Sequence, residues 1–334
     1  MTRTALIVGG SGQIGLATAR NLLEHGWRVS LAQRHADGLP ADLTRQVTAV
    51  ALDRDEPQAL ARAVAGGVDA LIDNFAFTED HARQLLEIED DVGAFVVMSS
   101  ASVYRDGAGR SFDEAARNGF PRFPVPMGED QPTVDPGPAT YSTRKAALEQ
   151  TLLQNARAPV TILRPGAIYG EGSRHLREWW FVRRILDGRR RIPLAYDGAS
   201  RFHASAAANI AELARVALEQ PGTRTLNAVD PQALTVVEMG QAVAAAYGAD
   251  LEFVPVPGPP KNGVGGNPWC IPGPLVLDMA RAEALGYRPV TRYEDAVGAA
   301  CRSAEQAVKA GARMPDYIEK LFDYAAEDAF FGGA

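Results

Sequence analysis

The stretch VGGSGQIG, residues 8–15, decides the fold class of this 334-residue chain. It follows the apolar run ALIV, residues 5–8, and precedes a helical pattern that ends near Gly26. Its glycines let the backbone approach a diphosphate, and the helix that begins there offers free N–H groups to an anion. A glycine triplet on the first strand–helix turn predicts a dinucleotide-binding site. Its candidate residues are Gly9, Ser11, Gly12, Gln13, Ile14 and Gly15.

The first half of the chain repeats this alternation of strands and helices. Further apolar runs occupy residues 28–33, 47–53, 68–77, 93–100 and 159–170, with helical patterns between them. Nearly continuous apolar strands that alternate with helices predict a parallel sheet covered on both faces. We therefore expect an α/β fold with a Rossmann-like, doubly wound parallel sheet. The expected NAD(P)-binding domain covers residues 1–170, and a smaller mixed substrate-binding lobe, interleaved with the core sheet, covers residues 171–334.

The composition of the chain limits the binding partners and the cellular compartment that we expect. A net charge of −7 argues against bulk binding to nucleic acid or to anionic membranes. No run of 18 apolar residues occurs, and the apolar start is too short for a secretory signal, so no membrane span or export is expected. Cys270 and Cys301 form no metal-binding motif, and so few cysteines suit a reducing compartment. We expect a cytoplasmic protein with a small-molecule substrate, no metal, and a homodimer as its candidate oligomer.

The ends of the second and third strands bear on the choice of cofactor. An acidic residue after the second strand would bind a free ribose 2′-hydroxyl, but Gln33 and Arg34 stand there. An arginine suits a 2′-phosphate and favours NADP over NAD, although a solvated surface arginine is the alternative. Asp53 ends the third strand, where it could accept a hydrogen bond from the adenine amino group or cap a helix.

Two later segments carry a candidate proton-transfer site. The fifth strand ends near Ser100 and Ser102, and the stretch TYSTRK, residues 140–145, places Tyr141 four residues before Lys145. Residues four apart share a helix face, and an ammonium beside a phenol lowers the phenol pKa from about 10. The lysine could also hold the nicotinamide ribose, and a serine hydroxyl could hold the substrate oxygen. This set predicts carbonyl–alcohol proton transfer beside a hydride carrier.

These motifs resemble the extended branch of the short-chain dehydrogenases/reductases, the NAD(P)-dependent epimerase/dehydratase family. The segments GGSGQIG, SSASVY and YSTRK match its glycine turn, its serine strand end and its Tyr–Lys pair. LRPGAIYG, residues 163–170, matches the segment that passes the nicotinamide carboxamide, and ARAEALGYRP, residues 280–289, matches a C-terminal helix and turn. The resemblance implies Ser100, Tyr141 and Lys145 as catalytic residues and Pro165 as a cofactor contact.

The chain also departs from this family. Dehydratases carry an Asp–Glu pair after the strand-end hydroxyl, whereas Ala101 and Ser102 follow Ser100 here, so dehydration is not expected. Arg201 matches an arginine that often grips a sugar-nucleotide diphosphate, and it joins Ser100 and Ser102 as a candidate substrate-binding residue. Residues 205–207 replace the acidic region that usually follows, which argues against an ordinary sugar nucleotide. The fourth and fifth strands also resemble chloroplast stem-loop RNA-binding proteins.

The Ser–Tyr–Lys set with Arg34 leads us to expect an NAD(P)-dependent oxidoreductase. Its expected form is an NADPH-dependent carbonyl reductase or alcohol dehydrogenase. One alternative is an NAD(P)-dependent sugar or sugar-nucleotide epimerase, which oxidises and re-reduces one carbon on a retained cofactor. Another is a non-catalytic RNA-binding relative, which the net charge and the intact catalytic set disfavour.

Three remaining features lie in the second half. The proline- and glycine-rich residues 255–274 predict a mobile lid that orders when substrate binds. For the basic, aromatic residues 173–191 we favour a helix with core tryptophans and solvated arginines over contact with a charged substrate. His203 is expected to be a hydrogen-bonded structural histidine.

Overall fold

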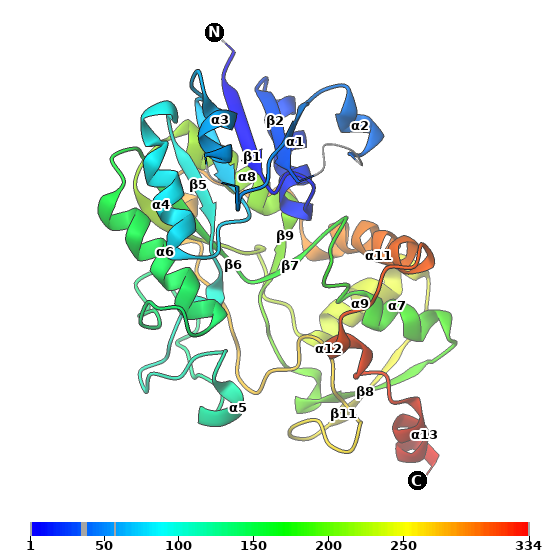
Figure 1. Cartoon of the computed structure of the whole chain (residues 1–334). Coiled ribbons are helices and arrows are strands. Elements are labelled where there is room, and N and C mark those ends of the chain that lie inside the picture. The colour runs from blue at the N-terminus through cyan, green and yellow to red at the C-terminus, as the bar shows by residue number, and fades with distance from the viewer. Residues whose placement is uncertain (1, 35–38, 57, 333–334) are drawn as a thin grey trace.

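The computed structural model describes residues 2–34, 39–56 and 58–332 (Figure 1). Its main feature is a seven-stranded sheet in the order β10–β6–β5–β4–β1–β2–β3, in which all neighbouring strands run parallel. The strands are β1 (Thr4–Val8), β2 (Arg28–Gln33), β3 (Thr48–Ala51), β4 (Ala70–Asp73), β5 (Phe95–Met98), β6 (Val160–Pro165) and β10 (Arg224–Ala228).

Helices cover both faces of this sheet. On one face α1 (Gln13–Glu24) packs against α8 (Ala207–Glu219), and on the other α4 (Glu79–Glu87) packs against α6 (Tyr141–Asn155). Separate apolar clusters fill the two interfaces. The predicted Rossmann-like α/β fold is confirmed. Short elements complete this lobe: α2 (Ala41–Thr44), α3 (Ala59–Val64), η1 (Glu89–Asp91), η2 (Ala101–Val103), α5 (Ala115–Asn118) and α10 (Ala280–Ala284).

Strand β10 was not predicted from the sequence. It follows α8 and pairs with β6 from Arg224 opposite Thr161 to Ala228 opposite Pro165. Its sequence RTLNA has no continuous apolar run, because the fully buried Asn227 interrupts it. Tertiary partners satisfy this asparagine, so the strand could not be found from local pattern alone. The chain thus returns to the main sheet beyond residue 170.

The second lobe packs around aromatic side chains. Its helices and strands are α7 (Trp179–Leu186), α9 (Val236–Tyr247), α11 (Tyr293–Lys309), α12 (Asp316–Glu319), α13 (Tyr324–Gly332), η3 (Tyr196–Gly198), and the parallel pairs β8 (Arg191–Ala195) with β11 (Glu252–Val256) and β7 (Ala167–Tyr169) with β9 (Ala204–Ala206). Trp179 and Trp180 are buried in the core, as predicted. The expectation of solvated arginines is wrong for Arg184. It is fully buried because Glu327 accepts its hydrogen bond at 2.5 Å and its guanidinium lies 3.7 Å from the Trp180 ring centroid.

The loop of residues 255–274 is anchored to the second lobe. Trp269 is 1% exposed and stacks on Phe181, with ring centroids 5.7 Å apart. The Ser200 hydroxyl donates to the Ile271 carbonyl at 2.7 Å. These contacts argue against a mobile lid for the second half of the segment, whereas residues 257–263 are exposed and their mobility stays a prediction. A buried tryptophan and buried hydrogen bonds fix the second half although its proline and glycine content prevents regular secondary structure.

Glu178 is a buried acid at the start of α7 and gives the protein a pH-dependent stability. It is 2% exposed, and its Oε1 has no hydrogen-bond partner among the described residues. Burial raises the pKa of its carboxyl from 4.5 to about 7. The native state therefore keeps a proton that the unfolded state releases, so the free energy of unfolding falls as pH rises through this interval.

Glu178→Gln should remove this loss of stability. Relative to wild type, we expect the variant to gain about 3 kcal/mol near pH 8, where the acid is ionised in both states, and to gain little near pH 5. Denaturant unfolding of both proteins across this pH range measures the difference. Parallel stability profiles would show that Glu178 does not titrate in the folded protein.

Candidate active site

A cavity of about 700 Å³ lies at the carboxyl ends of β1 to β4. The glycine turn between β1 and α1 forms one wall, and the segments that follow β2, β3 and β4 form the others. Gly172, Arg174 and His175, which lie beyond β7, also line it. In a parallel sheet this edge, where the strand order reverses next to β1, is where a dinucleotide binds.

The glycine turn requires glycine at two positions. Gly9 has φ +74°, in the left-handed region that favours glycine. A Cβ on Gly15 would lie 2.5 Å from the Gly9 carbonyl oxygen, so no side chain fits where α1 crosses the turn. Gly12 precedes α1, and no side chain caps the helix. The first-turn N–H groups are therefore left for an anion. Ser11, Gln13 and Ile14, also predicted from the sequence, line the same cavity.

The ends of β2 and β3 meet at the same cavity. Gln33 is buried at the end of β2, and the exposed Arg34 follows it. Asp53 is exposed in the cavity wall, and its Oδ1 accepts a hydrogen bond from the Asp55 N–H at 3.0 Å. Since α3 begins after Gln58, Asp53 is not the helix cap considered from the sequence. The structure thus brings Arg34 and Asp53 together in one cavity wall.

Side chains after β3 and β4 also shape the cavity, and the sequence had not singled them out as site residues. Arg54 forms a buried ion pair with Asp73 at the end of β4, and Asp73 Oδ1 accepts from the Phe75 N–H at 2.9 Å. Asn74 lines the cavity, and neither its amide oxygen nor its amide nitrogen has a partner in the described part of the chain. Buried polar atoms of this kind are normally satisfied, so they fit a ligand rich in donors and acceptors. A dinucleotide has that character.

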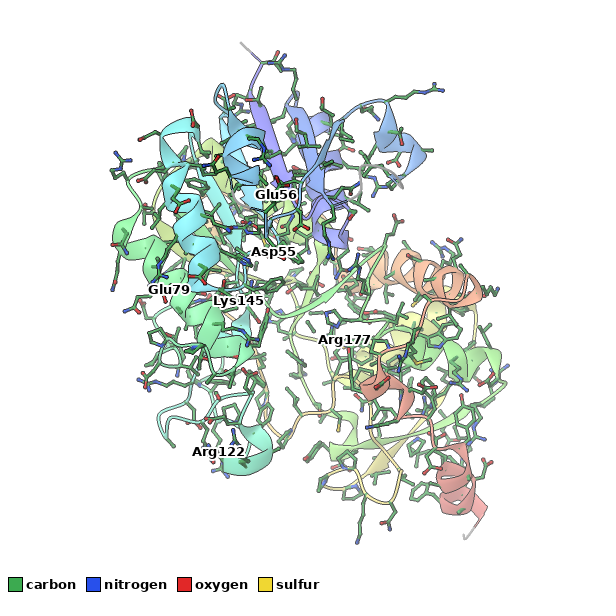
Figure 2. The ribbon with its side chains drawn as sticks, viewed as in Figure 1. Asp55, Glu56, Glu79, Arg122, Lys145 and Arg177 are labelled. Carbon is green, nitrogen blue, oxygen red and sulfur yellow. The ribbon has the colours of Figure 1, made fainter. Side chains whose placement is uncertain are left out.

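Lys145 is buried between the ends of β4 and β5. Its Nζ donates to the Ala76 carbonyl at 2.5 Å and to the Met98 carbonyl at 2.7 Å. The Phe77 ring centroid is 4.4 Å from the same nitrogen. Burial lowers the pKa of Lys145 to about 8. Figure 2 shows Lys145 toward the middle of the molecule, so α6 carries this cation into the first lobe.

Tyr141 begins α6 and remains 39% exposed. Burial of the phenol raises the pKa of Tyr141 above its ordinary value, a hydrogen bond with Ser100 lowers it, and the Asp113 carboxylate raises it. The predicted lowering of this pKa by Lys145 is therefore wrong for this structure. The Nζ lies 5.9 Å from the Tyr141 ring centroid, and two backbone carbonyls already hold the ammonium. The structure does bring Ser100 and Tyr141 together.

The serine strand end is held against α6 by a buried network. Ser100 Oγ accepts from the Ser102 N–H at 3.1 Å, which forms the turn η2. Behind this turn, the Tyr104 hydroxyl donates to Asn227 Oδ1 at 2.6 Å, and the Arg164 guanidinium lies 4.7 Å from the Tyr104 ring centroid. Arg164 also pairs with Glu149 of α6 at 2.5 Å. This network fixes Ser100 relative to the helix that carries Tyr141, and local sequence gave no sign of it.

Like Ser100, Tyr141 and Lys145, the remaining predicted residues do not line the cofactor cavity. Pro165 is buried at the end of β6, opposite Ala228. The Arg201 guanidinium donates to the Ala233 carbonyl and lies 3.9 Å from Glu238, at the start of α9. His203 bonds the Asp230 carbonyl at 2.8 Å, and burial lowers its pKa to about 4, so its predicted structural role is confirmed.

The glycine turn, the buried lysine and the Ser100–Tyr141 pair stand on one Rossmann-like sheet. The model of the NAD dependent epimerase/dehydratase family matches residues 5–228. The chain belongs to this family. It is therefore an NAD(P)-dependent enzyme of the short-chain dehydrogenase/reductase type. No curated protein matches the sequence.

Solved structures share the fold at low sequence identity. UDP-glucose 4-epimerase of Thermus thermophilus, in complex with NAD, is 21% identical with a TM-score of 0.65, over 91% of this chain and 99% of that one. UDP-glucuronic acid 4-epimerase of Bacillus cereus, in complex with UDP-glucuronic acid and NAD, is 17% identical with a TM-score of 0.64, over 91% and 99%. dTDP-glucose 4,6-dehydratase of Bacillus anthracis, with NAD, is 17% identical with a TM-score of 0.67, over 92% and 98%. None of the helices in the described part of the chain is long and apolar enough to cross a membrane.

Proposed function

We propose that this enzyme interconverts a secondary alcohol and a ketone in its substrate, and that its net reaction is the epimerisation of a sugar or sugar nucleotide. The observation that supports the proposal most is the contact between Ser100 and Tyr141 on the same sheet edge as the cavity at the glycine turn. Family membership supports it, because members with solved structures include 4-epimerases bound to NAD.

In the proposed mechanism, Tyr141 moves the hydroxyl proton. Its raised pKa keeps the phenol protonated at neutral pH, so it is ready to donate to a carbonyl oxygen. A bound nicotinamide supplies the hydride donor and acceptor. Ser100 hydrogen-bonds the substrate oxygen and aligns it with the phenol. In the oxidative direction the phenol must first release its proton; the phenolate form of Tyr141 then accepts the proton from the alcohol, and Ser100 again holds the oxygen.

Other reactions of the same chemical type are dehydration and carbonyl reduction. Ala101 and Ser102 follow Ser100 where a dehydratase needs a carboxylic acid pair, so we do not propose dehydration. An NADPH-dependent carbonyl reductase is the second candidate. Gln33 and Arg34 favour NADP over NAD, and a reductase exchanges its spent cofactor for NADPH from solution. Membership of an enzyme family favours either reaction over a non-catalytic RNA-binding role.

Retention of the cofactor distinguishes the two reactions. We expect purified, dialysed protein to release close to one equivalent of nicotinamide dinucleotide on denaturation, and to convert UDP-glucose or a related sugar without net change in nicotinamide absorbance. Empty protein that oxidises NADPH in proportion to an added ketone would instead establish the reductase. Tyr141→Phe serves as the inactive control in both assays.

Arg34 is proposed to give the enzyme a preference for NADP over NAD. A charge-assisted contact with a phosphate contributes about 1.5–3 kcal/mol, or roughly ten- to a hundredfold in affinity. Arg34→Ala should therefore weaken NADPH by this factor and leave NADH nearly unchanged. Calorimetric titration of both cofactors measures it, with the exposed Arg45→Ala as a matched control. Equal affinities in the wild type would rule the assignment out.

A further inference from the structure

The segment of residues 170–177, which we name the strap, runs along the wall of the cofactor cavity. It leads from β7 to α7, and its Gly172, Arg174 and His175 form part of the cavity wall. The strap belongs to the basic stretch whose arginines were expected to be solvated. Its position next to the glycine turn gives it a different role.

Contacts fix the strap to the second lobe. The Gly172 N–H donates to the Ser303 hydroxyl at 2.9 Å, in α11. Arg177 Nη1 donates to the Ile168 carbonyl of β7 at 3.2 Å, and Figure 2 shows Arg177 toward the middle of the molecule. The strap thus holds a defined path on the second lobe.

The start of the strap lies near the first turn of α1. A Cβ on Gly170 would lie 3.2 Å from the Ala207 Cβ, at the start of α8, and 3.9 Å from Gln13 Oε1, at the first residue of α1. Glu171 lies 3.9 Å from Arg20, two turns further along α1. The strap therefore passes beside α1, the helix whose N-terminus is where a diphosphate binds.

The charges in the cavity wall leave the diphosphate without an assigned cation. Residues 9–16 of the glycine turn contain no lysine or arginine, so they offer only N–H groups and the partial charge of a helix end. Arg54 is neutralised by its buried ion pair with Asp73. Arg34 stands at the end of β2. Arg174 is exposed in the cavity wall and has no carboxylate within 4.0 Å among the residues that the structure describes.

We propose that Arg174 binds the diphosphate of the dinucleotide cofactor from the side opposite the glycine turn, as a cofactor-positioning residue supplied by the strap. The inference rests on the proposed dinucleotide function of this cavity. Two arginines then divide the cofactor between them: Arg34 reads the 2′-phosphate and sets selectivity, whereas Arg174 holds the group that NAD and NADP share. Because the strap continues into α7, the cofactor also links the second lobe to the first.

Binding measurements on Arg174→Gln test this division. We expect the variant to bind NADH, NADPH and ADP about ten- to a hundredfold more weakly than wild type, with an unchanged ratio of NADPH to NADH affinity. Arg174→Lys keeps the charge and should retain more affinity than the glutamine variant. Arg190→Gln removes an exposed arginine from the same basic stretch outside the cavity wall and should change nothing. Isothermal titration calorimetry reads all four proteins without requiring turnover.

Each other outcome overturns the inference in a recognisable way. A loss confined to NADPH places Arg174 at the 2′-phosphate, and unchanged affinities make it a solvated surface residue. In both cases the wild type still binds dinucleotide, so the proposed function survives. A wild type that retains no dinucleotide on purification, and that in this empty state binds neither NADH nor NADPH, overturns the proposed function and this inference together.

Discussion

Tyr141→Phe should lower turnover by about 10²–10⁴-fold, the usual loss when a general acid–base group is removed. The substitution keeps the ring and removes only the hydroxyl. Since the Tyr141 side chain is 39% exposed and its ring contact with Phe77 is kept, the fold should be unaffected. Cofactor affinity should also remain near the wild-type value, because the phenolic oxygen is proposed to act on substrate.

Steady-state kinetics, calorimetric cofactor titration and thermal unfolding on the same preparation measure these three properties. Tyr196→Phe is a matched control, because it removes a phenol from η3 of the second lobe, away from the cofactor cavity. Ser100→Ala should reduce turnover less than Tyr141→Phe and leave cofactor affinity unchanged. Near-full activity of Tyr141→Phe would mean that the tyrosine serves packing alone and that another group transfers the proton.

Lys145→Met should damage both the fold and the chemistry. The Nζ donates to the carbonyls of Ala76 and Met98, which join the ends of β4 and β5 below the active site. Methionine leaves these buried acceptors without donors, and we expect the free energy of unfolding to fall by about 1–3 kcal/mol. Cofactor affinity and turnover should fall as well, because the lysine is proposed to hold the nicotinamide ribose.

The pH dependence of Lys145→Met gives a second signature. In the wild type the Lys145 ammonium is lost as pH rises through about 8, so activity that depends on the cation falls above this pH. The variant has no group to titrate there, and its residual activity should decline only at higher pH, where Tyr141 ionises. Denaturant unfolding and pH–rate profiles measure the two effects, with the exposed Lys261→Met as control. Unchanged stability together with an alkaline limb still near pH 8 would contradict both roles of Lys145.

Much of the first lobe could be predicted because its signals are local. The apolar runs that became β1 to β6 alternate with helical patterns, and all of these strands except the mostly exposed edge strand β3 are largely buried. The spacing of glycines predicts the turn around Gly9 and Gly15, because only glycine meets the backbone requirements at these positions. The pair Tyr141 and Lys145 is visible because one helical turn separates the residues.

The features that escaped prediction depend on partners far along the chain. Strand β10 contains the buried Asn227, whose side chain accepts a hydrogen bond from the Tyr104 hydroxyl and donates to the Met127 and Asp278 carbonyls, all far away in the sequence. Trp269 lies in a proline- and glycine-rich segment that predicts a lid, but its contact with Phe181 ties the segment down. The composition of a segment predicts which regular secondary structures it avoids, but not which residues it packs against.

The sequence by itself determined the fold class, the glycine turn and the residues of the Ser–Tyr–Lys set, because these follow from spacing and backbone geometry. Only the tertiary structure decided how the charges act. It raised the pKa of Tyr141, since burial of the phenol outweighs its hydrogen bond with Ser100, while two carbonyls hold the Lys145 ammonium. It also placed Arg174, about 160 residues after the glycine turn, in the wall of the same cavity. Electrostatic effects depend on distance and burial in space, and neither can be read along the chain.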